Sequence, residues 1–286
     1  MQTAIQPIPP QQTAVPSSEE TIAALLRIVP AAKVYCRDGC LHIVVGEEAV
    51  HSLHQYKVLL EGADWNPAGA GYALYPAGDV RRGLDEGRIF YNTVFTPVHL
   101  VYDSGRCALP SPLPLRVAQT EQQAREAFWF GYGQSCHFLQ CAQYMEQQGA
   151  ANVAAFLLHQ SVELLLRAFI IAVTGQEVRT HTLADLMKHT LRYAPGLRSC
   201  AGVSGEQLAG LPGKLEKAYV CGRYSPHFGV SAAGLPALSA DVAALQEEVF
   251  YCFGRVVMDY AGGIRSNNSY RELIAWRSCQ HGGRWR

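Results

Sequence analysis

Polar residues interrupt an apolar stretch near the middle of the sequence. His159, Glu163 and Arg167 follow one another at intervals of four residues, so a helix places all three side chains along one face. Such a row either binds a ligand or forms hydrogen bonds inside a helical bundle. The spacing by itself leaves both alternatives open.

A second polar cluster lies further along the chain and contains Arg223, Tyr224 and His227. The arginine and the histidine are four residues apart, but Pro226 between them disfavours helical backbone at the residue before it. We therefore expect His227 on a loop that leaves the helix, away from the helical face of Arg223.

The elements that must position these residues divide the chain into parts of different character. Residues 1–18 are rich in Pro, Gln and Ser, as in a flexible leader. Residues 19–106 mix short strands and helices, and a proline-rich linker covers 107–117. Helical periodicity follows over 118–263, before a basic tail at 264–286. The predicted fold class is α+β, a small mixed α/β domain followed by an all-α bundle.

Turn and cap residues locate the elements of the first part. The Asp38-Gly39 pair predicts a tight hairpin between two strands, and Pro30 ends a short helix before it. We expect helices over Glu19–Val29, Glu47–Leu60 and Asp79–Phe95, and strands over Lys33–Arg37, Leu41–Val45, Tyr72–Tyr75 and Val98–Tyr102.

Cap residues and apolar periodicity also define the second part. Gly175 suits a left-handed helix C-cap, and Thr182 with Asp185 resembles a helix N-cap. Short connections favour an antiparallel bundle. The helices are predicted over Thr120–Gln148, Ala151–Thr174, Thr182–Tyr193, Ser204–Tyr224 and Leu235–Tyr260.

Composition excludes several classes of protein. The 286 residues carry 24 Lys and Arg against 24 Asp and Glu, and only 17% of them are charged. A globally basic nucleic-acid binder and an intrinsically disordered chain are both excluded. The longest apolar run, Phe156 to Val173, contains His, Gln, Glu and Arg, so we expect no membrane helix. Nine scattered cysteines without a CxxC pair favour a reduced, cytoplasmic protein.

Taken together, the two polar clusters resemble the HEPN domain (higher eukaryotes and prokaryotes nucleotide-binding). The shared pattern is an apolar run ending in His-Gln-x-x-Glu, then Gly, Thr-His-x-Leu and Ala-Tyr-x-x-x-Arg-Tyr, in that order within residues 118–262. The resemblance implies a bundle of about five helices that commonly forms homodimers.

The first part resembles a minimal nucleotidyltransferase domain, which often accompanies HEPN domains. The resemblance rests on the strand LHIVV and on the later segment LDEGRIFYNTVFTPVHLVYDSGR. Active members need a Gly-Ser loop for the triphosphate, and an Asp-x-Asp pair with a third carboxylate for two magnesium ions. Here the corresponding segment is CRDGCLHIVV, with Asp38 alone and His42 inside the strand. The resemblance therefore implies a degenerate domain without nucleotidyltransferase activity.

Some HEPN proteins are metal-independent ribonucleases with an Arg-x(4-6)-His motif at the dimer cleft. There the histidine acts as general acid and base on the 2′-hydroxyl, and the arginine stabilises charge on the phosphate. Arg223 and His227 have three intervening residues, one fewer than that motif, and Pro226 is among them. This departure weighs against nuclease activity and leaves it as an alternative.

Three functions remain as hypotheses. The first is a non-catalytic homodimer that binds a nucleotide or RNA through His159, Glu163, Arg223, Tyr224 and His227. The second is a toxin-type ribonuclease in which Arg223 and His227 are catalytic. The third is a structural dimer with a buried polar network and no ligand. We expect no cofactor, no metal and no membrane partner. A separate regulatory protein is a candidate further partner, which the sequence does not decide.

Overall fold

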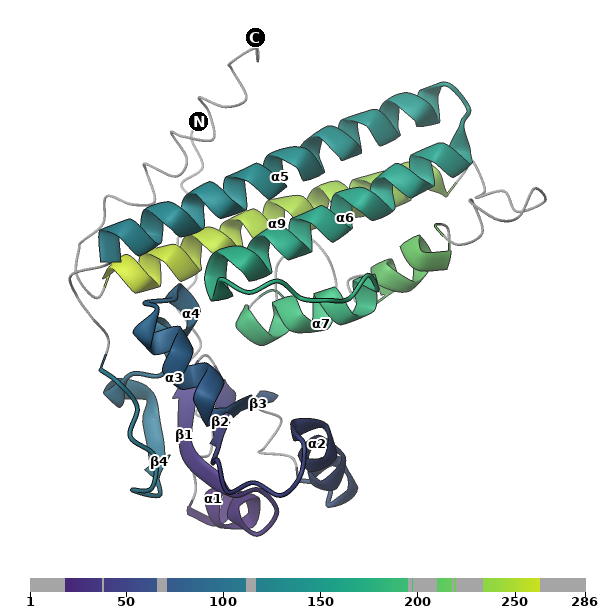
Figure 1. Cartoon of the computed structure of the whole chain (residues 1–286). Helices are drawn as coiled ribbons and strands as arrows, with labels where there is room; N and C mark the ends of the chain where they lie inside the picture. Colours follow the sequence, from purple (N-terminus) through teal and green to yellow (C-terminus); the bar gives the residue numbers. More distant parts are fainter. Residues whose placement is uncertain are drawn as a thin grey trace, which may run out of the picture. The chain divides into compact units, whose positions relative to one another are not determined.

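The structure of the protein is a computed structural model, and it describes residues 19–37, 39–65, 71–111, 117–194, 197, 210–217, 219 and 234–262. The chain forms two compact units. One unit contains a four-stranded sheet and the other a bundle of long helices (Figure 1). The predicted α+β fold class is confirmed.

The first unit is built around a mixed sheet with the strand order β3-β2-β1-β4. Strands β1 (Ala31–Arg37) and β2 (Cys40–Val45) form an antiparallel hairpin, and β4 (Leu100–Asp103) pairs antiparallel with the other edge of β1. Strand β3 (Gly71–Pro76) runs parallel to β2. A parallel neighbour needs a crossover connection, and a helix between β2 and β3 provides it.

The predicted hairpin is confirmed, while a cap decides where the next helix begins. Gly39 in the hairpin has a φ of 71°, a backbone conformation that glycine adopts without strain. The sequence predicts a helix from Glu47, but α2 spans Leu53–Gly62. The Gln55 backbone N–H donates to Ser52 Oγ (3.3 Å), and the Gln55 side chain accepts from the Ser52 backbone N–H (2.8 Å). This capping box satisfies N–H groups that a helix start leaves unpaired, so the helix begins there.

Apolar side chains of the sheet, of α1 (Glu19–Leu26) and of α2 make up the core of the first unit. All six residues of β2 are buried, as is typical of a central strand with a continuous hydrophobic run. The buried residues of this core include Ile22, Leu25, Val34, Leu41, Ile43, Tyr56 and Leu60.

The second unit is a bundle whose three longest helices lie side by side (Figure 1). These helices are α5 (Val117–Gln147), α6 (Ala151–Thr174) and α9 (Leu235–Gly262), and α7 (Leu183–Tyr193) packs against α6. Their bounds confirm four of the predicted helices to within a few residues. The fourth predicted helix, Ser204–Tyr224, lies partly outside the described residues, and residues 210–217 of it are helical.

A close approach and a polar cluster join the three long helices. A Cβ on Gly131 of α5 would lie 2.5 Å from Ala168 Cβ of α6, so α5 and α6 can meet there because residue 131 has no side chain. The amide of Gln246 on α9 donates to the hydroxyls of Ser135 on α5 (2.8 Å) and Ser161 on α6 (3.0 Å). All three polar residues are buried, and their mutual hydrogen bonds offset the cost of burial.

The segment Arg81–Thr96, which precedes the proline-rich linker in the sequence, belongs to the bundle unit. The sequence predicts one helix over Asp79–Phe95, but Gly87, with a φ of 70°, separates α3 (Ala77–Asp85) from α4 (Ile89–Val94). Helix α4 packs against α6 and α9. The second unit therefore comprises Arg81–Thr96 in addition to the chain from Leu109 onward, whereas the sequence-based division assigns all of 19–106 to the first domain.

Helix α6 is strongly apolar. By length and composition alone it could span a membrane, since its mean hydropathy over an 18-residue window is 1.7. In the structure 61% of that window is buried, and buried core helices of bundles meet the same criterion.

Candidate functional site

Helix α6 carries the row of polar side chains predicted to share one face. Glu163 stands in the middle, with Oε1 2.9 Å from Arg167 Nη2 and Oε2 3.9 Å from His159 Nδ1. His159 is only 3% exposed, and the side chains of Glu163 and Arg167 are partly buried. The three side chains therefore do share a face, and that face is largely covered by other parts of the bundle.

Gln160 completes the hydrogen bonding around the carboxylate. Its side-chain amide donates to Glu163 Oε2 (3.2 Å) and to His159 Nδ1 (3.2 Å). With this orientation of the amide, Nδ1 of the imidazole is an acceptor. A neutral His159 therefore carries its proton on Nε2.

Arg167 holds the connection between α6 and α7. Its Nη1 donates to the carbonyl of Val178 (2.8 Å), and its Nη2 donates to the carbonyl of Thr180. The same guanidinium binds the carboxylate of Glu163 through Nε and Nη2. A guanidinium with these partners positions the connecting segment and is neutralised by Glu163, so it is a poor candidate for binding a phosphate.

The connecting segment brings a second histidine to Glu163. His181 Nδ1 lies 3.3 Å from Glu163 Oε1, and the His181 side chain is 91% exposed. The same nitrogen also lies 3.3 Å from Arg167 Nη2, so the ion pair of Glu163 and Arg167 orients the imidazole. Glu163 therefore lies between a buried and an exposed histidine, and the exposed one is accessible to a ligand.

The start of α7 is capped from a distant part of the chain. Thr182 occupies the predicted N-cap position, but its hydroxyl donates to the Asp185 carboxylate (2.7 Å) and accepts no hydrogen bond from a backbone N–H of the first turn. The backbone N–H of Ala184 donates instead to Glu216 Oε1 (3.2 Å). A carboxylate at a helix N-terminus is stabilising, so this contact fixes the helical residues 210–217 against the start of α7.

Tyr219 covers His159. The two rings stack with centroids 4.2 Å apart and an interplanar angle of 23°, and Tyr219 also stacks on Phe156 at 5.7 Å and 18°. Burial lowers the pKa of His159, and the carboxylates of Glu163 and Glu216 oppose that effect only in part. His159 is therefore neutral at pH 7, within a stack of aromatic rings.

The structure brings together two of the five predicted binding residues. His159 and Glu163 are joined through Gln160 and lie in one network. The other three, Arg223, Tyr224 and His227, lie outside the described residues, so their roles stay predictions.

Sequence reasoning did not single out three members of this network. Gln160 and His181 lie within the His-Gln-x-x-Glu and Thr-His-x-Leu patterns, so the motifs contain a signal for both. Glu216 has no local signal, because its cap on Ala184 joins residues 32 positions apart.

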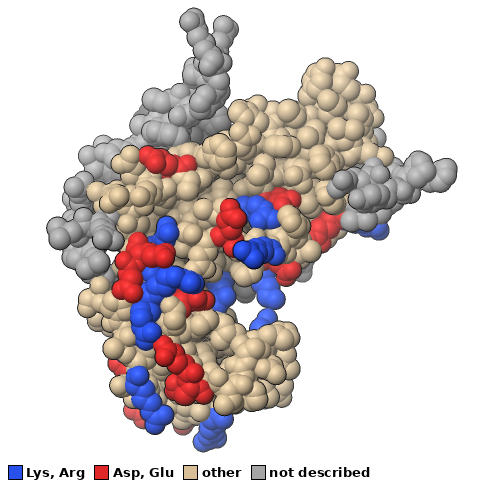
Figure 2. Space-filling model, in the orientation of Figure 1, with Lys and Arg blue, Asp and Glu red and all other residues tan. Residues whose placement is uncertain are grey.

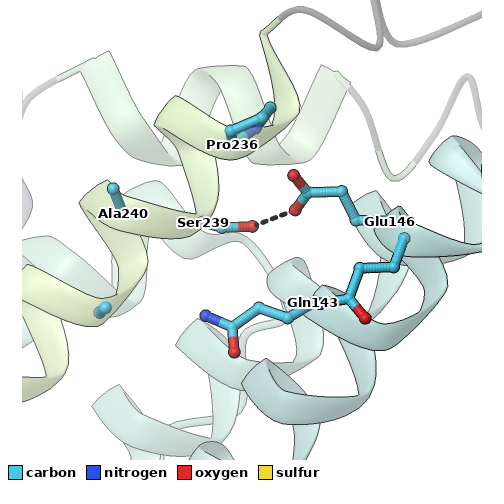
Figure 3. Close-up of a pocket in the computed structure, with 7 residues that line it drawn as sticks. Gln143, Glu146, Pro236, Ser239 and Ala240 are labelled. Atoms are coloured by element: carbon cyan, nitrogen blue, oxygen red, sulfur yellow. Dashed lines mark hydrogen bonds between the residues drawn. The ribbon is translucent and has the colours of Figure 1, made fainter.

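A separate cavity of 310 Å³ lies between the end of α5 and the start of α9 (Figure 3). Ser239 Oγ donates to Glu146 Oε2 there (3.1 Å), and of the predicted site residues that the structure describes, neither His159 nor Glu163 lines the cavity. Within the described parts of the chain, no group of three or more His, Cys, Asp or Glu side chains is placed to hold a metal ion. The cavity and the α6 network are therefore distinct features.

Comparison with known proteins places the polar network inside a family domain. Residues 132–243 match the HEPN domain, from the middle of α5 to the start of α9. No curated protein matches the chain. The HEPN family is associated with RNA binding and ribonuclease activity. The helical C-terminal part of this protein, with the His159–Glu163 network inside it, contains a HEPN domain over residues 132–243.

Proposed function

We propose that this protein is a non-catalytic binder of RNA or a nucleotide, and that it acts as a homodimer. The observation that carries the proposal is the stack of Tyr219 on His159 inside a HEPN domain. Arg223 follows Tyr219 by four residues, so chain length alone keeps its Cα within about 14 Å of the Tyr219 Cα. A segment that begins four residues after this stack is therefore long enough to reach the network around Glu163.

The charges of the network support this assignment of the binding residues. A phosphate ligand needs a cation that is not already neutralised, and Arg167 is bound to Glu163 and to two backbone carbonyls. Arg223 supplies a guanidinium suited to bidentate phosphate binding, and Tyr224 supplies a ring on which a base can stack. His181 and His227 add hydrogen-bonding groups that carry charge only when protonated.

The proposal for the first unit is a nucleotidyltransferase-like domain that has lost catalysis. Two-metal phosphoryl transfer needs carboxylate oxygens on neighbouring strands. The parallel strands β2, with the sequence CLHIVV, and β3, with the sequence GYALYP, contain no Asp or Glu. His42 of β2 is buried, with Nδ1 3.1 Å from the Tyr75 hydroxyl. These observations favour a recognition role for this unit.

RNA binding by the full chain is tested by fluorescence anisotropy with a fluorescein-labelled single-stranded RNA. Hydrogen bonds to a charged group are worth about 1.5–3 kcal/mol, so Arg223→Ala should weaken binding by about tenfold or more. Arg27→Ala, which removes an exposed arginine of the first unit, is the control and should bind as the wild type does. ATP, tested by the rise in melting temperature that it causes, is the probe for a nucleotide ligand.

The outcomes separate the three hypotheses. Absence of binding to both probes would contradict the proposal and favour the structural dimer. Equal binding by Arg223→Ala would contradict the assignment of Arg223 to the binding site. Incubation with RNA in EDTA should leave the RNA intact. Cleavage that disappears in His227→Ala would replace the proposal with the ribonuclease.

A further inference from the structure

The cavity between α5 and α9 has a polar wall, which α5 provides (Figure 3). Gln143, Glu146 and Gln147 line this wall, and their spacing of three and four residues from Gln143 places them on one face of the helix. The carboxylate and the two amides supply oxygen atoms that accept hydrogen bonds. Several acceptors on one wall suit a ligand group that carries several N–H donors.

The facing wall, which α9 provides, is formed by small apolar side chains. Pro236, Ala240 and Ala243 line it, at intervals of four and three residues along one face of the helix. These side chains leave room for an aliphatic chain and offer it no hydrogen bond. The cavity volume of 310 Å³ is at the lower end of the range for ligand pockets, about 300–1,000 Å³, so the ligand is small.

A buried hydroxyl orients the carboxylate of Glu146 within the cavity. Ser239, which is 5% exposed, donates from Oγ to Glu146 Oε2 (3.1 Å). Figure 3 shows these two side chains pointing toward one another. Within the described residues, this is the one hydrogen bond that the carboxylate makes, so Oε1 is available to accept from a ligand.

Glu146 has no opposite charge near it on the two helices that form the cavity. From Ala127 to Met145, α5 contains no Asp, Glu, Lys or Arg, and Figure 2 shows the surface over most of α5 without charged residues. On α9 the first charged residue is Asp241, and the first Lys or Arg is Arg255. Among the lining residues that the structure describes, none is Lys, Arg or His. The cavity therefore favours a cation.

Two other kinds of ligand fit this lining less well. A phosphate or carboxylate ligand has the same charge as Glu146, and the described lining residues supply no cation to offset the repulsion. Calcium and magnesium ions are held mainly by several oxygen ligands with carboxylates among them, whereas one carboxylate lines the cavity. An organic cation, by contrast, uses both the polar wall and the apolar wall.

We propose that this cavity binds a small organic cation, an alkyl chain that ends in a guanidinium or ammonium group. The charged group donates to Glu146 Oε1 and to the amide oxygens of the polar wall. The alkyl chain lies along the α9 wall, in the way that the stems of Lys and Arg side chains cover apolar surface. The group belongs either to a free small molecule or to a side chain of a peptide. This site is separate from the proposed site for RNA or a nucleotide.

Binding is tested by the rise in melting temperature of the full chain with butylguanidine, at constant ionic strength. Butylurea, a neutral analogue of similar size, should cause no rise. Glu146→Gln keeps an acceptor for Ser239 and removes the charge, so about tenfold more butylguanidine or higher should be needed for the same rise. Glu126→Gln changes an exposed glutamate of the same helix and should respond as the wild type does.

The role of the apolar wall is tested by Ala240→Leu. Ala240 is exposed, so a leucine there leaves the core unchanged while its side chain fills the space of the alkyl chain. This variant should be folded by circular dichroism and should lose the response to butylguanidine. A folded Ala240→Leu that responds as the wild type does would overturn the placement of the alkyl chain.

The source of the cation is tested with the peptide acetyl-Gly-Arg-Gly-amide, which carries the same charged group. A rise at similar or lower peptide concentrations supports a peptide side chain as the ligand, and a rise with butylguanidine alone supports a free small molecule. No rise with either compound, an equal rise with butylurea, or an unchanged response in Glu146→Gln would overturn the proposal. RNA binding by Glu146→Gln should equal that of the wild type, so failure at this cavity leaves the proposed function standing.

Discussion

At the scale of single residues, His159 shows how burial changes the chemistry of a side chain. A histidine in water is a proton carrier near neutral pH. Here Tyr219 stacks on the ring and Gln160 donates to Nδ1, while burial lowers the pKa. The buried ring joins α6 to Tyr219, whereas the His181 side chain beside Glu163 is exposed to solvent.

The pKa of His159 predicts how stability depends on pH. Its folded pKa lies below the value of about 6.5 in the unfolded chain, so below that pH the unfolded state takes up a proton that the folded state does not bind. The free energy of unfolding therefore falls as the pH drops below about 6.5. His159→Gln should lose less stability between about pH 7 and pH 5 than the wild type, as measured by urea unfolding.

His189 contributes in the same direction, because burial also lowers its pKa, with Arg192 adding to the effect. His159→Gln should therefore reduce the fall in the free energy of unfolding at low pH, and the part that is due to His189 should remain. An unchanged loss of stability in His159→Gln would show that His159 is not a source of the effect.

At the scale of elements, contacts between helices decide which local sequence features matter. The Thr182 hydroxyl binds Asp185, and α7 receives its backbone cap from Glu216. The buried cluster of Ser135, Ser161 and Gln246 fixes the three long helices against one another. In the Glu216 cap and in the buried cluster, a polar group has its partner on another element.

Changing glycine to alanine should have opposite effects on stability at two positions of α5. Gly131→Ala puts a methyl group 2.5 Å from Ala168 Cβ, and such overpacking costs about 1–3 kcal/mol. Gly133→Ala meets nothing within 4 Å, and it should stabilise the monomer by up to about 1 kcal/mol through helix propensity. Thermal or urea unfolding at a concentration where the chain is monomeric measures both. Destabilisation of similar size at both positions would contradict this account of the helix contacts.

At the scale of the whole molecule, the two units differ in the buried groups whose pKa values are shifted. Burial raises the pKa of Tyr35, in the sheet unit, to about 12, and Asp103 and Cys107 add to the effect. A tyrosine with a raised pKa stabilises the fold below about pH 10, and this contribution is lost as the pH rises towards the folded pKa. The histidines with lowered pKa values belong to the bundle unit.

Burial also raises the pKa of Tyr260 in the bundle, but the sheet unit holds two such tyrosines, Tyr35 and Tyr72. Alkali should therefore weaken the sheet unit more than the bundle, and acid should weaken the bundle. Trp65 contacts Tyr72 in the first unit, and Trp129 contacts Phe250 in the second. Two variants each keep a single tryptophan, with the other tryptophans changed to Phe. During urea unfolding, the fluorescence of Trp65 reports on the sheet unit and the fluorescence of Trp129 reports on the bundle unit. At about pH 11 the midpoint reported by Trp65 should fall more than that reported by Trp129, and Tyr35→Phe should reduce the difference. Equal shifts for both reporters would contradict the assignment to separate units.

Local features of the sequence were sufficient to predict the long helices and the hairpin. Apolar periodicity marks α5, α6 and α9, Gly175 marks the end of α6, and Gly39 marks the turn between β1 and β2. Each of these signals depends on residues close together in the chain, where backbone geometry and helix periodicity act directly. The pattern of His, Glu and Thr-His motifs also led correctly to the HEPN domain.

The sequence by itself determined an α+β protein with a HEPN bundle and a row of polar residues on one face of α6. The tertiary structure alone decided that α4 belongs to the bundle, that Glu216 caps α7, and that Tyr219 stacks on His159. These contacts join residues far apart in the chain, and they depend on which surfaces are close enough to exclude water. No local pattern encodes that proximity.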